Sequence, residues 1–266
     1  MLSGKIETAI RSSFKQKTSA LIIMDPNNQT SVVASRRLLK SIQDTESAIE
    51  AVLFPATTPD TLDSHLKEFG LTRNDWTYPS TPGESRIDMR SGLTLSAYNA
   101  KDIRKVMACA VSHMRLWKQC AMRQSAFIIL EHDAIFTRKF DILSESTKSD
   151  RSADAFVDAS IIGLNDPRRA TRKSGIYLQR LLDSREKDQF IYNVPYVDDD
   201  DKAPQGLAGN SAYFIRPSAA SQLLAKIEQM GIWPNDALMC KQFIPGLRQA
   251  YPFFTTLQGV QSTTQG

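Results

Sequence analysis

The sequence has few of the features that mark exported, membrane-spanning or disulfide-rich proteins. Its 266 residues contain only three cysteines, an odd number at no spacing typical of zinc ligands. No apolar run approaches the length of a membrane-spanning helix, and residues 1–17 contain no apolar core of signal-peptide length. We therefore expect a cytoplasmic protein without a transmembrane segment, in which Cys109, Cys120 and Cys240 are reduced, buried thiols.

A strong charge excess, internal repeats and low-complexity segments are also missing. The 33 Lys and Arg residues exceed the 29 Asp and Glu residues by only four, which permits a phosphate-bearing ligand or a polyanionic partner but requires neither. The apolar content is ordinary for a globular protein and supplies enough material for a core. We expect one domain over residues 1–266. Within it, residues 1–19 form an N-terminal extension with a short amphipathic helix, and residues 259–266 form a flexible tail.

Short apolar runs alternate with amphipathic segments, and this alternation predicts an α/β protein. Residues 20–24 form an expected strand that ends in a turn at residues 25–28, and a helix over 35–51 leads to a strand at 52–54. This βαβ unit implies a parallel sheet with a right-handed crossover. The other expected elements are helices over 62–69, 99–124, 217–231 and 237–243, strands over 126–130, 159–164, 212–215 and 250–254, and a surface connection over 137–155.

The most informative stretch joins a strand to a short acidic motif. Residues 126–130 are all apolar, which predicts a strand buried on both faces, and they lead directly into Glu131, His132 and Asp133. Acids at the end of such a strand lie at the carboxyl edge of the sheet, where open α/β sheets bind ligands. On an extended chain Glu131 and Asp133 point to one side and His132 to the other. Two acids on one side suit a divalent cation that carries phosphate oxygens; ordinary solvated acids after a core strand are the alternative.

The helix expected over residues 99–124 has the best apolar periodicity in the chain. Because it leads directly into the strand at 126–130, we expect the two to pack as one unit. His113 lies on or beside the apolar stripe of this helix. A lone histidine in such a position is typical of a packed, hydrogen-bonded core residue.

Three further segments allow either a functional or a structural interpretation. The basic loop at 168–173 is typical of a solvated surface, although the same charges would also steer an anionic acceptor. The four acids at 198–201 are likewise typical of a solvated loop, with cation binding as the alternative. Small residues at 206–211, among them Asn210, precede a strand and allow a ligand or another backbone to come close.

Three segments, in this order, resemble glycosyltransferase family 25, whose members include lipooligosaccharide and collagen galactosyltransferases. The first, Ala108–Trp117, is a helical segment with a cysteine, a serine and a histidine. The second, Phe127–Phe136, is an aliphatic strand followed by the acidic motif, and the third, Ala212–Ala220, leads from a strand into a helix. The resemblance is most specific in the first two segments.

The resemblance implies a GT-A-type fold, in which a Rossmann-like, mixed but mostly parallel sheet flanked by helices binds a nucleotide-sugar. It also implies that Glu131 and Asp133 hold a divalent cation, Mn²⁺ or Mg²⁺, against the diphosphate of the donor, a UDP-sugar. The family usually has aspartate where this chain has His132, which lowers the local negative charge and puts the identity of the metal and strict metal dependence in doubt. Ala108 stands where the family tends to have glycine, a change that a helix tolerates.

The same resemblance assigns a set of donor-binding residues. Asp25, or the turn that follows it, is expected to receive the nucleoside. Arg36 or Arg37 is expected to pair with phosphate or base, and solvent-exposed side chains are the alternative. Ser112, His113 and Asn210 complete the set, with Ser112 and His113 supporting the metal-bearing strand from behind.

The family is generally inverting, so the resemblance also implies a carboxylate base. Asp236, in a turn at the start of a helix, is the candidate, and a simple favourable interaction with the helix dipole is the alternative. We expect a glycosyltransferase that moves galactose or a similar hexose to a hydroxyl of a saccharide acceptor. The alternatives are the same chemistry on a protein side chain or a modified nucleic-acid base, and a catalytically degenerate module that only binds nucleotide-sugar.

Overall fold

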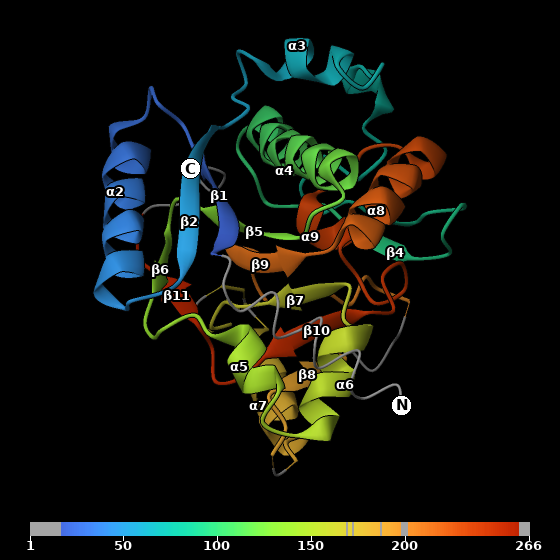
Figure 1. The fold of residues 1–266 in the computed structure, drawn as a ribbon. Helices are drawn as coiled ribbons and strands as arrows, with labels where there is room; N and C mark the ends of the chain where they lie inside the picture. Colours follow the sequence, from blue (N-terminus) through green and yellow to red (C-terminus); the bar gives the residue numbers. More distant parts are fainter. Residues whose placement is uncertain (1–16, 169, 172, 187, 198–201, 261–266) are drawn as a thin grey trace.

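A seven-stranded sheet forms the centre of the protein, and helices cover both of its faces (Figure 1). The computed structural model describes residues 17–168, 170–171, 173–186, 188–197 and 202–260. The strand order is β2-β1-β5-β9-β7-β10-β8. The strands span Thr18–Met24 (β1), Ile49–Pro55 (β2), Phe127–Glu131 (β5), Ile161–Gly163 (β7), Ile191–Asn193 (β8), Ala212–Ile215 (β9) and Leu247–Ala250 (β10).

The sheet is mixed, with most strands in one direction. Strands β2, β1 and β5 are parallel neighbours, and β9 runs antiparallel to both β5 and β7. Strand β10 is parallel to β7 and antiparallel to β8. Therefore β1, β2, β5, β7 and β10 share one direction, and their carboxyl ends lie at one edge of the sheet. This arrangement confirms the expected fold class, a Rossmann-like, mixed and mostly parallel sheet flanked by helices.

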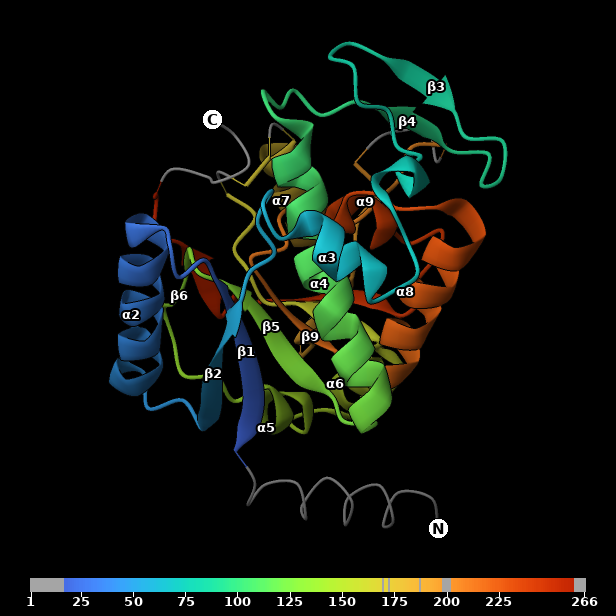
Figure 2. The same cartoon turned by 90° about the horizontal axis from the view of Figure 1, so that it is seen from above.

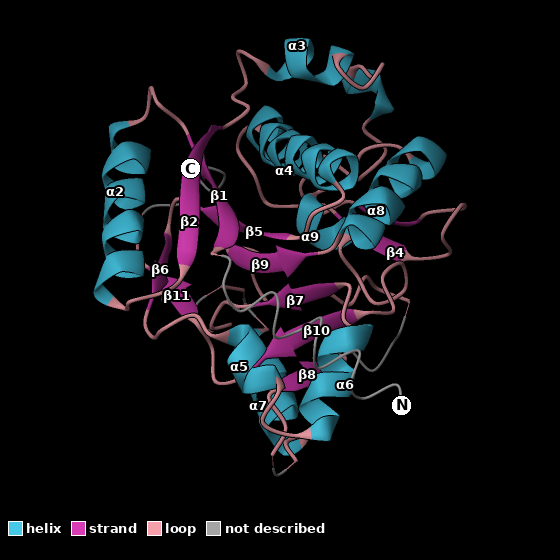
Figure 3. Ribbon diagram, in the orientation of Figure 1, coloured by secondary structure: helices cyan, strands magenta, loops and turns pink. Residues whose placement is uncertain are grey.

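Two buried clusters attach the helices to the two faces of the sheet. Helices α3, α4, α7, α8 and α9 contribute to the cluster that contains Trp117, and α2, α5 and α6 contribute to the cluster that contains Leu38. Figures 2 and 3 show α4 and α8 side by side, away from α2. The helices span Gln29–Asp44 (α2), Leu62–Lys67 (α3), Ile103–Arg123 (α4), Ile142–Ser146 (α5), Asp150–Asp158 (α6), Ser174–Asp183 (α7), Pro217–Met230 (α8) and Asn235–Leu238 (α9), with a 3-10 turn at Arg73–Asp75.

Two short antiparallel ribbons complete the strands. Strand β6 (Ala134–Phe136) pairs with β11 (Thr255–Leu257), and β3 (Ser85–Ile87) pairs with β4 (Thr94–Ser96). Because β6 follows β5 after a turn at residues 132–133, the β6–β11 ribbon starts directly at the carboxyl end of β5. Figure 2 shows the β3–β4 ribbon at the periphery.

The predicted unit of a long helix and a buried strand is confirmed. Residues Phe127–Leu130 of β5 are all buried because the strand lies inside the sheet with a cluster on each face. Helix α4 begins at Ile103, where the carboxylate of Asp102 accepts the backbone N–H of Arg104 at 3.0 Å. The cap places the start of the helix four residues later than the predicted residue 99.

The first helix lies earlier in the chain than predicted. Helix α2 begins at Gln29 because the side chain of Asn28 accepts the backbone N–H of Ser31 and caps it. It ends at Asp44 rather than at residue 51, so Ile49 is the first residue of β2 and does not belong to the helix. The turn signal at residues 25–28 was correct, but it contained the helix cap as well.

Three other predicted segments differ from the structure. Residues 137–155, expected as a surface connection, contain α5 and most of α6. Residues 250–254 do not form an edge strand, since β10 ends at Ala250 between β7 and β8 and the chain bends before β11. The last helix, α9, covers Asn235–Leu238 rather than residues 237–243.

Some predictions concern residues that the structure does not describe. They are the helix and extension over residues 1–16, the acidic run at 198–201, positions 169 and 172 of the basic loop, and the tail beyond residue 260. Thr18 and Ser19 belong to β1 and are therefore not part of an extension. Within the described ranges, no helix has both the length and the apolar composition needed to cross a membrane.

Candidate functional site

A cavity of about 350 Å³ lies at the carboxyl ends of β1 and β5. Its wall comes from the turn after β1 with the start of α2, the loop after β2, the first half of α4, and the end of β5. This is the position in which parallel α/β sheets bind ligands. We call it the β1–β5 cavity; its lining residues are Ile23, Asp25, Asn28, Thr30, Ser31, Ala56, Thr57, Thr58, Pro59, Lys105, Ala108, Cys109, Ser112, His113, Glu131 and His132.

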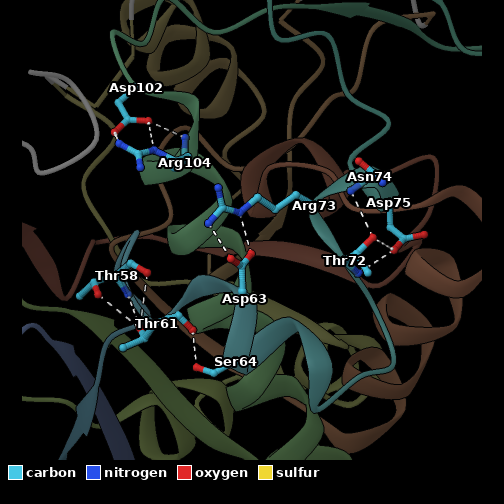
Figure 4. Close-up of polar contacts among 10 residues, drawn as sticks. All are labelled: Thr58, Thr61, Asp63, Ser64, Thr72, Arg73, Asn74, Asp75, Asp102 and Arg104. Carbon is cyan, nitrogen blue, oxygen red and sulfur yellow. Dashed lines mark hydrogen bonds and ion pairs between the residues drawn. The ribbon is translucent and has the colours of Figure 1, made fainter.

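Hydrogen bonds fix the loop that follows β2 against α4. Ser112 Oγ accepts the backbone N–H of Thr57 at 2.8 Å and donates to the carbonyl of Ala108 at 2.9 Å. The backbone N–H of Thr58 donates to Thr61 Oγ1 at 2.9 Å, which holds the entry to α3 (Figure 4). Ser112 therefore shapes one wall of the cavity through its own hydrogen bonds.

The positive charges near the cavity are not equivalent. The guanidinium of Arg104 is bound to Asp102, with the closest contact at 2.8 Å (Figure 4). Lys105, the next residue, lines the cavity. Arg36 has an exposed side chain in α2 and is not among the lining residues, which corresponds to the solvent-exposed alternative of the sequence analysis. Lys105, and not Arg36, is thus a cation that the cavity offers to an anionic ligand.

A chain of hydrogen bonds runs from the core to Glu131. Trp117 Nε1 lies 2.9 Å from Tyr213 Oη, which in turn lies 2.7 Å from His113 Nδ1. His113 Nε2 lies 3.1 Å from Glu131 Oε1. An indole N–H only donates, so the Tyr213 hydroxyl accepts from Trp117 and donates its proton to Nδ1. The imidazole N–H is then at Nε2 and donates a hydrogen bond to the carboxylate of Glu131. The series of hydrogen bonds therefore orients this carboxylate.

Glu131 and Asp133 have opposite environments although one residue separates them. Burial favours a higher pKa for Glu131, but the hydrogen bond from His113 and the positive potential of both neighbouring histidines hold that pKa below its usual value. Burial, together with repulsion from Glu131, raises the pKa of Asp133 to about 7. Asp133 Oδ1 is buried and has no hydrogen-bond partner among the described residues. The carboxylate of Glu131 thus receives a hydrogen bond from a side chain, whereas only a backbone hydrogen bond opposes the rise in the pKa of Asp133.

The turn at residues 132–133 differs from the extended geometry expected from the sequence. The expectation that His132 faces away is wrong, because His132 lines the β1–β5 cavity together with Glu131. Strand β5 ends at Glu131, so strict alternation of side chains stops there. Gln258 holds the turn. Its backbone N–H donates to the carbonyl of Asp133 at 2.8 Å, and its side-chain amide contacts the carbonyls of His132 and Ala134 at 3.1 and 2.9 Å.

Asp236, the predicted base, lies in α9 within electrostatic reach of Glu131. Burial raises the pKa of Asp236, and the repulsion from Glu131 adds to this effect, whereas a hydrogen bond from Tyr98 opposes it. Burial also raises the pKa of the Cys109 thiol, with Glu131 and Asp236 as further causes. These mutual effects place Asp236 and Cys109 in one electrostatic group with the acids at the end of β5.

The side chains at the end of β5 fit a hard divalent cation better than a soft one. Cys109, His113 and Glu131 each offer an atom within 4.8 Å of the others, a set that resembles a zinc site in composition. Both ring nitrogens of His113 are engaged in the hydrogen-bond chain, however, and burial raises the pKa of the Cys109 thiol, which disfavours the thiolate that zinc requires. The other set is the oxygens of Glu131 and Asp133, a ligand type that suits Mg²⁺ and Mn²⁺. Glu131 lines the β1–β5 cavity, and Asp133 lies beside it in the turn that follows.

Asn210 lies next to the end of β5 but not on the wall of the cavity. The carbonyl of Ser211 accepts the backbone N–H of Glu131 at 2.8 Å. Asn210 is 7% exposed, and neither of its amide atoms has a partner among the described residues. At the start of the same segment, a Cβ added to Gly206 would lie 2.8 Å from the carbonyl of Met239. Gly206 therefore allows the backbone at Met239 to come close. The sequence analysis predicted that the small residues at 206–211 allow either a ligand or another backbone to approach, and at Gly206 it is the backbone.

The structure therefore brings most of the predicted residues to one edge of the sheet, either on the cavity wall or beside it, and leaves Arg36 outside. The residues that the sequence analysis missed are Thr57, Tyr98, Lys105, Trp117 and Tyr213. A lysine in the first turn of a helix is disfavoured by the helix dipole, so Lys105 gave a usable signal for an anionic ligand. Trp117 and Tyr213 lie on apolar stripes and give no signal that separates them from ordinary core residues.

Comparisons with known proteins concern the sequence family and the solved structures to which the chain is similar. The sequence model of a family described as "Glycosyltransferase family 25 (LPS biosynthesis protein)" matches residues 34–239. No curated protein matches the chain. Among solved structures, the chain is similar to the apo structure of the WbbM bifunctional glycosyltransferase, with a TM-score of 0.41 and 10% identity over 88% of this chain and 38% of that one. It is also similar to apo mouse xyloside xylosyltransferase 1, with a TM-score of 0.41 and 10% identity over 86% and 83%. The chain thus spans well under half the length of the first of these proteins.

Proposed function

The chain belongs to glycosyltransferase family 25 and is a glycosyltransferase, and on this premise we propose which reaction it catalyses. It transfers galactose or a similar hexose from a UDP-sugar to a hydroxyl of a saccharide acceptor, with inversion and with a divalent cation. The family description, which refers to LPS biosynthesis, supports a saccharide acceptor. A cytoplasmic location, as expected from the sequence, is part of the proposal.

One observation carries the proposal. Asp133 Oδ1 is buried without a partner among the described residues, two positions from an oriented carboxylate at the carboxyl edge of the sheet. A buried acid without compensation is costly, and a bound cation would remove that cost. Mn²⁺ or Mg²⁺ held by Asp133 and Glu131 would neutralise negative charge on the diphosphate leaving group.

The chain's own residues provide the rest of the donor site. The first turn of α2, with Asn28 and Ser31 on the cavity wall, presents backbone N–H groups at a helix N-terminus, and Lys105 adds a positive charge. Both features attract phosphate oxygens. Asp25 lies at the end of β1, where nucleotide-binding folds receive the nucleoside, and it lines the same cavity.

Asp236 is the proposed base for the acceptor hydroxyl. A base works best when its pKa is not far below the operating pH, and the raised pKa of Asp236 moves it in that direction. The hydrogen bond from Tyr98 fixes the carboxylate, so Tyr98 is a positioning residue. An interaction with the dipole of α9 contributes little, because that helix has only four residues.

The direct test is turnover of a nucleotide-sugar. The protein is incubated with UDP-galactose, UDP-glucose, UDP-N-acetylglucosamine or GDP-mannose and MnCl₂, with and without simple glycosides, and released nucleotide is measured. We expect release from at least one UDP-sugar that EDTA suppresses and MnCl₂ restores. Asp133→Asn should lose this activity, and Asp154→Asn, which changes an exposed acid in α6, is the matched control. Absence of both turnover and thermal shift with every donor would refute the proposal.

A second candidate has one specific observation in its favour. His132 lines the cavity at the position where the family usually has aspartate, which reduces the negative charge available to a cation. This favours a degenerate module that binds nucleotide-sugar without transfer. A protein that binds UDP at the β1–β5 cavity but never releases nucleotide from any donor would support it. The nucleic-acid alternative is weaker, because Arg168 of the basic loop is paired with Asp166.

A further inference from the structure

A second cavity, of about 490 Å³, lies between α7 and the segment that joins β10 to β11. We call it the aromatic cavity, after Tyr251 and Phe253 in its wall. Leu178 and Leu182 of α7 form an apolar side, and the start of β11 forms another part of the wall. No residue of the β1–β5 cavity lines it, so it is a separate site.

The aromatic side of the cavity is fixed in place. The rings of Tyr251 and Phe253 meet edge to face, with centroids 5.1 Å apart and an angle of 87° between their planes. The guanidinium of Arg185 lies 4.8 Å from the centroid of Tyr251. Both rings are only half-buried. They therefore give the cavity a rigid apolar surface that is open to a ligand.

Among the described residues of the wall, the charges on the polar side of the cavity cancel. The carboxylate of Asp166 accepts hydrogen bonds from the backbone N–H of Arg168 at 2.9 Å and from its guanidinium at 2.5 to 3.0 Å. Asp166 is buried, whereas the side chain of Arg168 is 69% exposed. Because the carboxylate neutralises the guanidinium, this wall suits an uncharged polar ligand better than a phosphate.

One side chain in the wall lacks a hydrogen bond. Thr255 is fully buried, lines the cavity, and its Oγ1 has no partner among the described residues. Buried hydroxyls almost always have a partner, and leaving one unpaired is unfavourable. A ligand hydroxyl in the cavity would provide it. This feature is independent of the aromatic rings and of the ion pair.

The β6–β11 ribbon links the aromatic cavity to the acidic turn. Thr255 pairs with Phe136, and three residues further along, the backbone N–H of Gln258 donates to the carbonyl of Asp133. At about 3.3 Å per residue of strand, Thr255 lies roughly 10 Å from the turn that carries Asp133. A short oligosaccharide is long enough to span such a distance.

We propose that the aromatic cavity binds a neutral pyranose unit of the acceptor, one that is remote from the hydroxyl that reacts. This inference rests on the proposed function. A pyranose has an apolar C–H face for Phe253 and Tyr251 and hydroxyls for Thr255 and Arg168. Cavities that combine an apolar surface with a few polar groups bind ligands of this mixed character. Because the bound unit is remote from the reacting hydroxyl, the cavity favours acceptors that are longer than one sugar.

The test uses methyl β-galactopyranoside, lactose and maltose as probes, with binding followed by saturation-transfer NMR on the full chain. We expect binding of at least one probe and a loss of about tenfold in affinity for Phe253→Ala, as for an interface anchor. Thr255→Val should weaken binding about fivefold without lowering the melting temperature, because the hydroxyl that it removes has no partner among the described residues. Tyr196→Ala, an exposed tyrosine outside both cavities, is the control and should bind like the wild type.

The outcomes separate this inference from the proposed function. UDP binding is measured on the same samples and reports on the β1–β5 cavity. If UDP binds and none of the sugars does, or if the sugars bind equally well to Phe253→Ala and Thr255→Val, the aromatic cavity is not an acceptor site. If Thr255→Val unfolds at a clearly lower temperature, its hydroxyl is structural and the inference falls. If the sugars bind in a variant-sensitive way but UDP does not, the sugar site stands and the proposed donor site fails.

Discussion

The two carboxylates at the end of β5, Glu131 and Asp133, have different environments although only one residue separates them. Glu131 receives a hydrogen bond from His113, which is itself held by Tyr213 and Trp117 of the core. Asp133 lies in the turn that follows, where its Oδ1 is buried without a partner among the described residues. The pKa of Glu131 is held below its usual value, and that of Asp133 is raised to about 7.

The difference indicates a division of roles. The hydrogen bonds from the core fix the side chain of Glu131 before any cation binds. Binding of the cation then costs less conformational entropy. An uncompensated second carboxylate supplies the electrostatic attraction, because its burial cost is relieved only when positive charge arrives. Under the proposed function, the fold orients one acid in advance, and the burial cost of the other would be relieved by the bound cation. The four predictions that follow test this contrast, from the largest expected effect to the smallest.

Asp133→Asn should abolish most of the transferase activity. Loss of a cation ligand removes several kcal/mol of charge stabilisation, which corresponds to about a thousandfold in kcat/KM. Steady-state release of UDP at saturating MnCl₂ measures the effect. Asp154→Asn, the exposed control in α6, should retain full activity. A variant at position 133 with more than a tenth of wild-type activity would show that Asp133 is not a ligand.

The same variant should make the metal-free protein more stable at high pH. The carboxyl of Asp133 titrates near pH 3.9 in the unfolded chain and at about pH 7 in the folded protein. Between these values the folded state binds more protons, so the free energy of unfolding of the wild type falls as the pH rises. Denaturation in urea with EDTA at pH 5 and pH 8 should show that the advantage of Asp133→Asn grows by on the order of 3 kcal/mol. A constant difference across this range would contradict the assigned environment.

His113→Gln should weaken binding of the cation by a smaller factor. The substitution removes the ring nitrogen that donates to Glu131, and loss of a residue that orients a ligand typically costs 10- to 100-fold in metal affinity. Titration of Mn²⁺ by electron paramagnetic resonance gives the affinity directly. Asp154→Asn, the exposed control in α6, serves as the control here as well. Equal Mn²⁺ affinities for wild type and His113→Gln would show that His113 is only a packing residue.

Trp117→Phe should have the smallest effect of the four. It removes the first hydrogen bond of the chain and leaves Tyr213 without that donor, which costs about 1 kcal/mol of unfolding free energy. Affinity for Mn²⁺ should fall less than with His113→Gln, because Tyr213 still contacts His113 Nδ1. If Trp117→Phe lost more Mn²⁺ affinity than His113→Gln, the hydrogen bonds would not orient Glu131 in the order Trp117, Tyr213, His113.

Sequence reasoning found the elements whose patterns are long and regular. Strand β5 and helix α4 follow from a continuous apolar run and a 3.6-residue period, and both were predicted close to their observed bounds. The start of α2 was missed because the Asn28 cap lies ten residues before Leu38, where the apolar period becomes clear. Helices α5 and α6 were missed because they are short and rich in serine and acids, so packing rather than propensity determines them.

The candidate site was only partly predictable. Placement of Glu131 at the carboxyl edge followed from the strand that precedes it. The side on which His132 lies did not, since it depends on where the strand stops and the turn starts, and a contact with Gln258 holds that turn. Tyr213 reaches His113 and Trp117 of α4 across about a hundred residues of sequence, and no local pattern records such a contact.

Gln258 also sets the order in which the site is completed during synthesis. It follows His132 by 126 residues, and its amide donates to carbonyls of the acidic turn and of Ala34 in α2. On the ribosome, β1, α2, α4 and β5 emerge long before this clamp does. A chain that lacks residue 258 still contains every strand of the central sheet, but it lacks the contacts that hold the turn with Asp133. Purified chains that end before and after Gln258 should differ in Mn²⁺ binding and not in their resistance to protease.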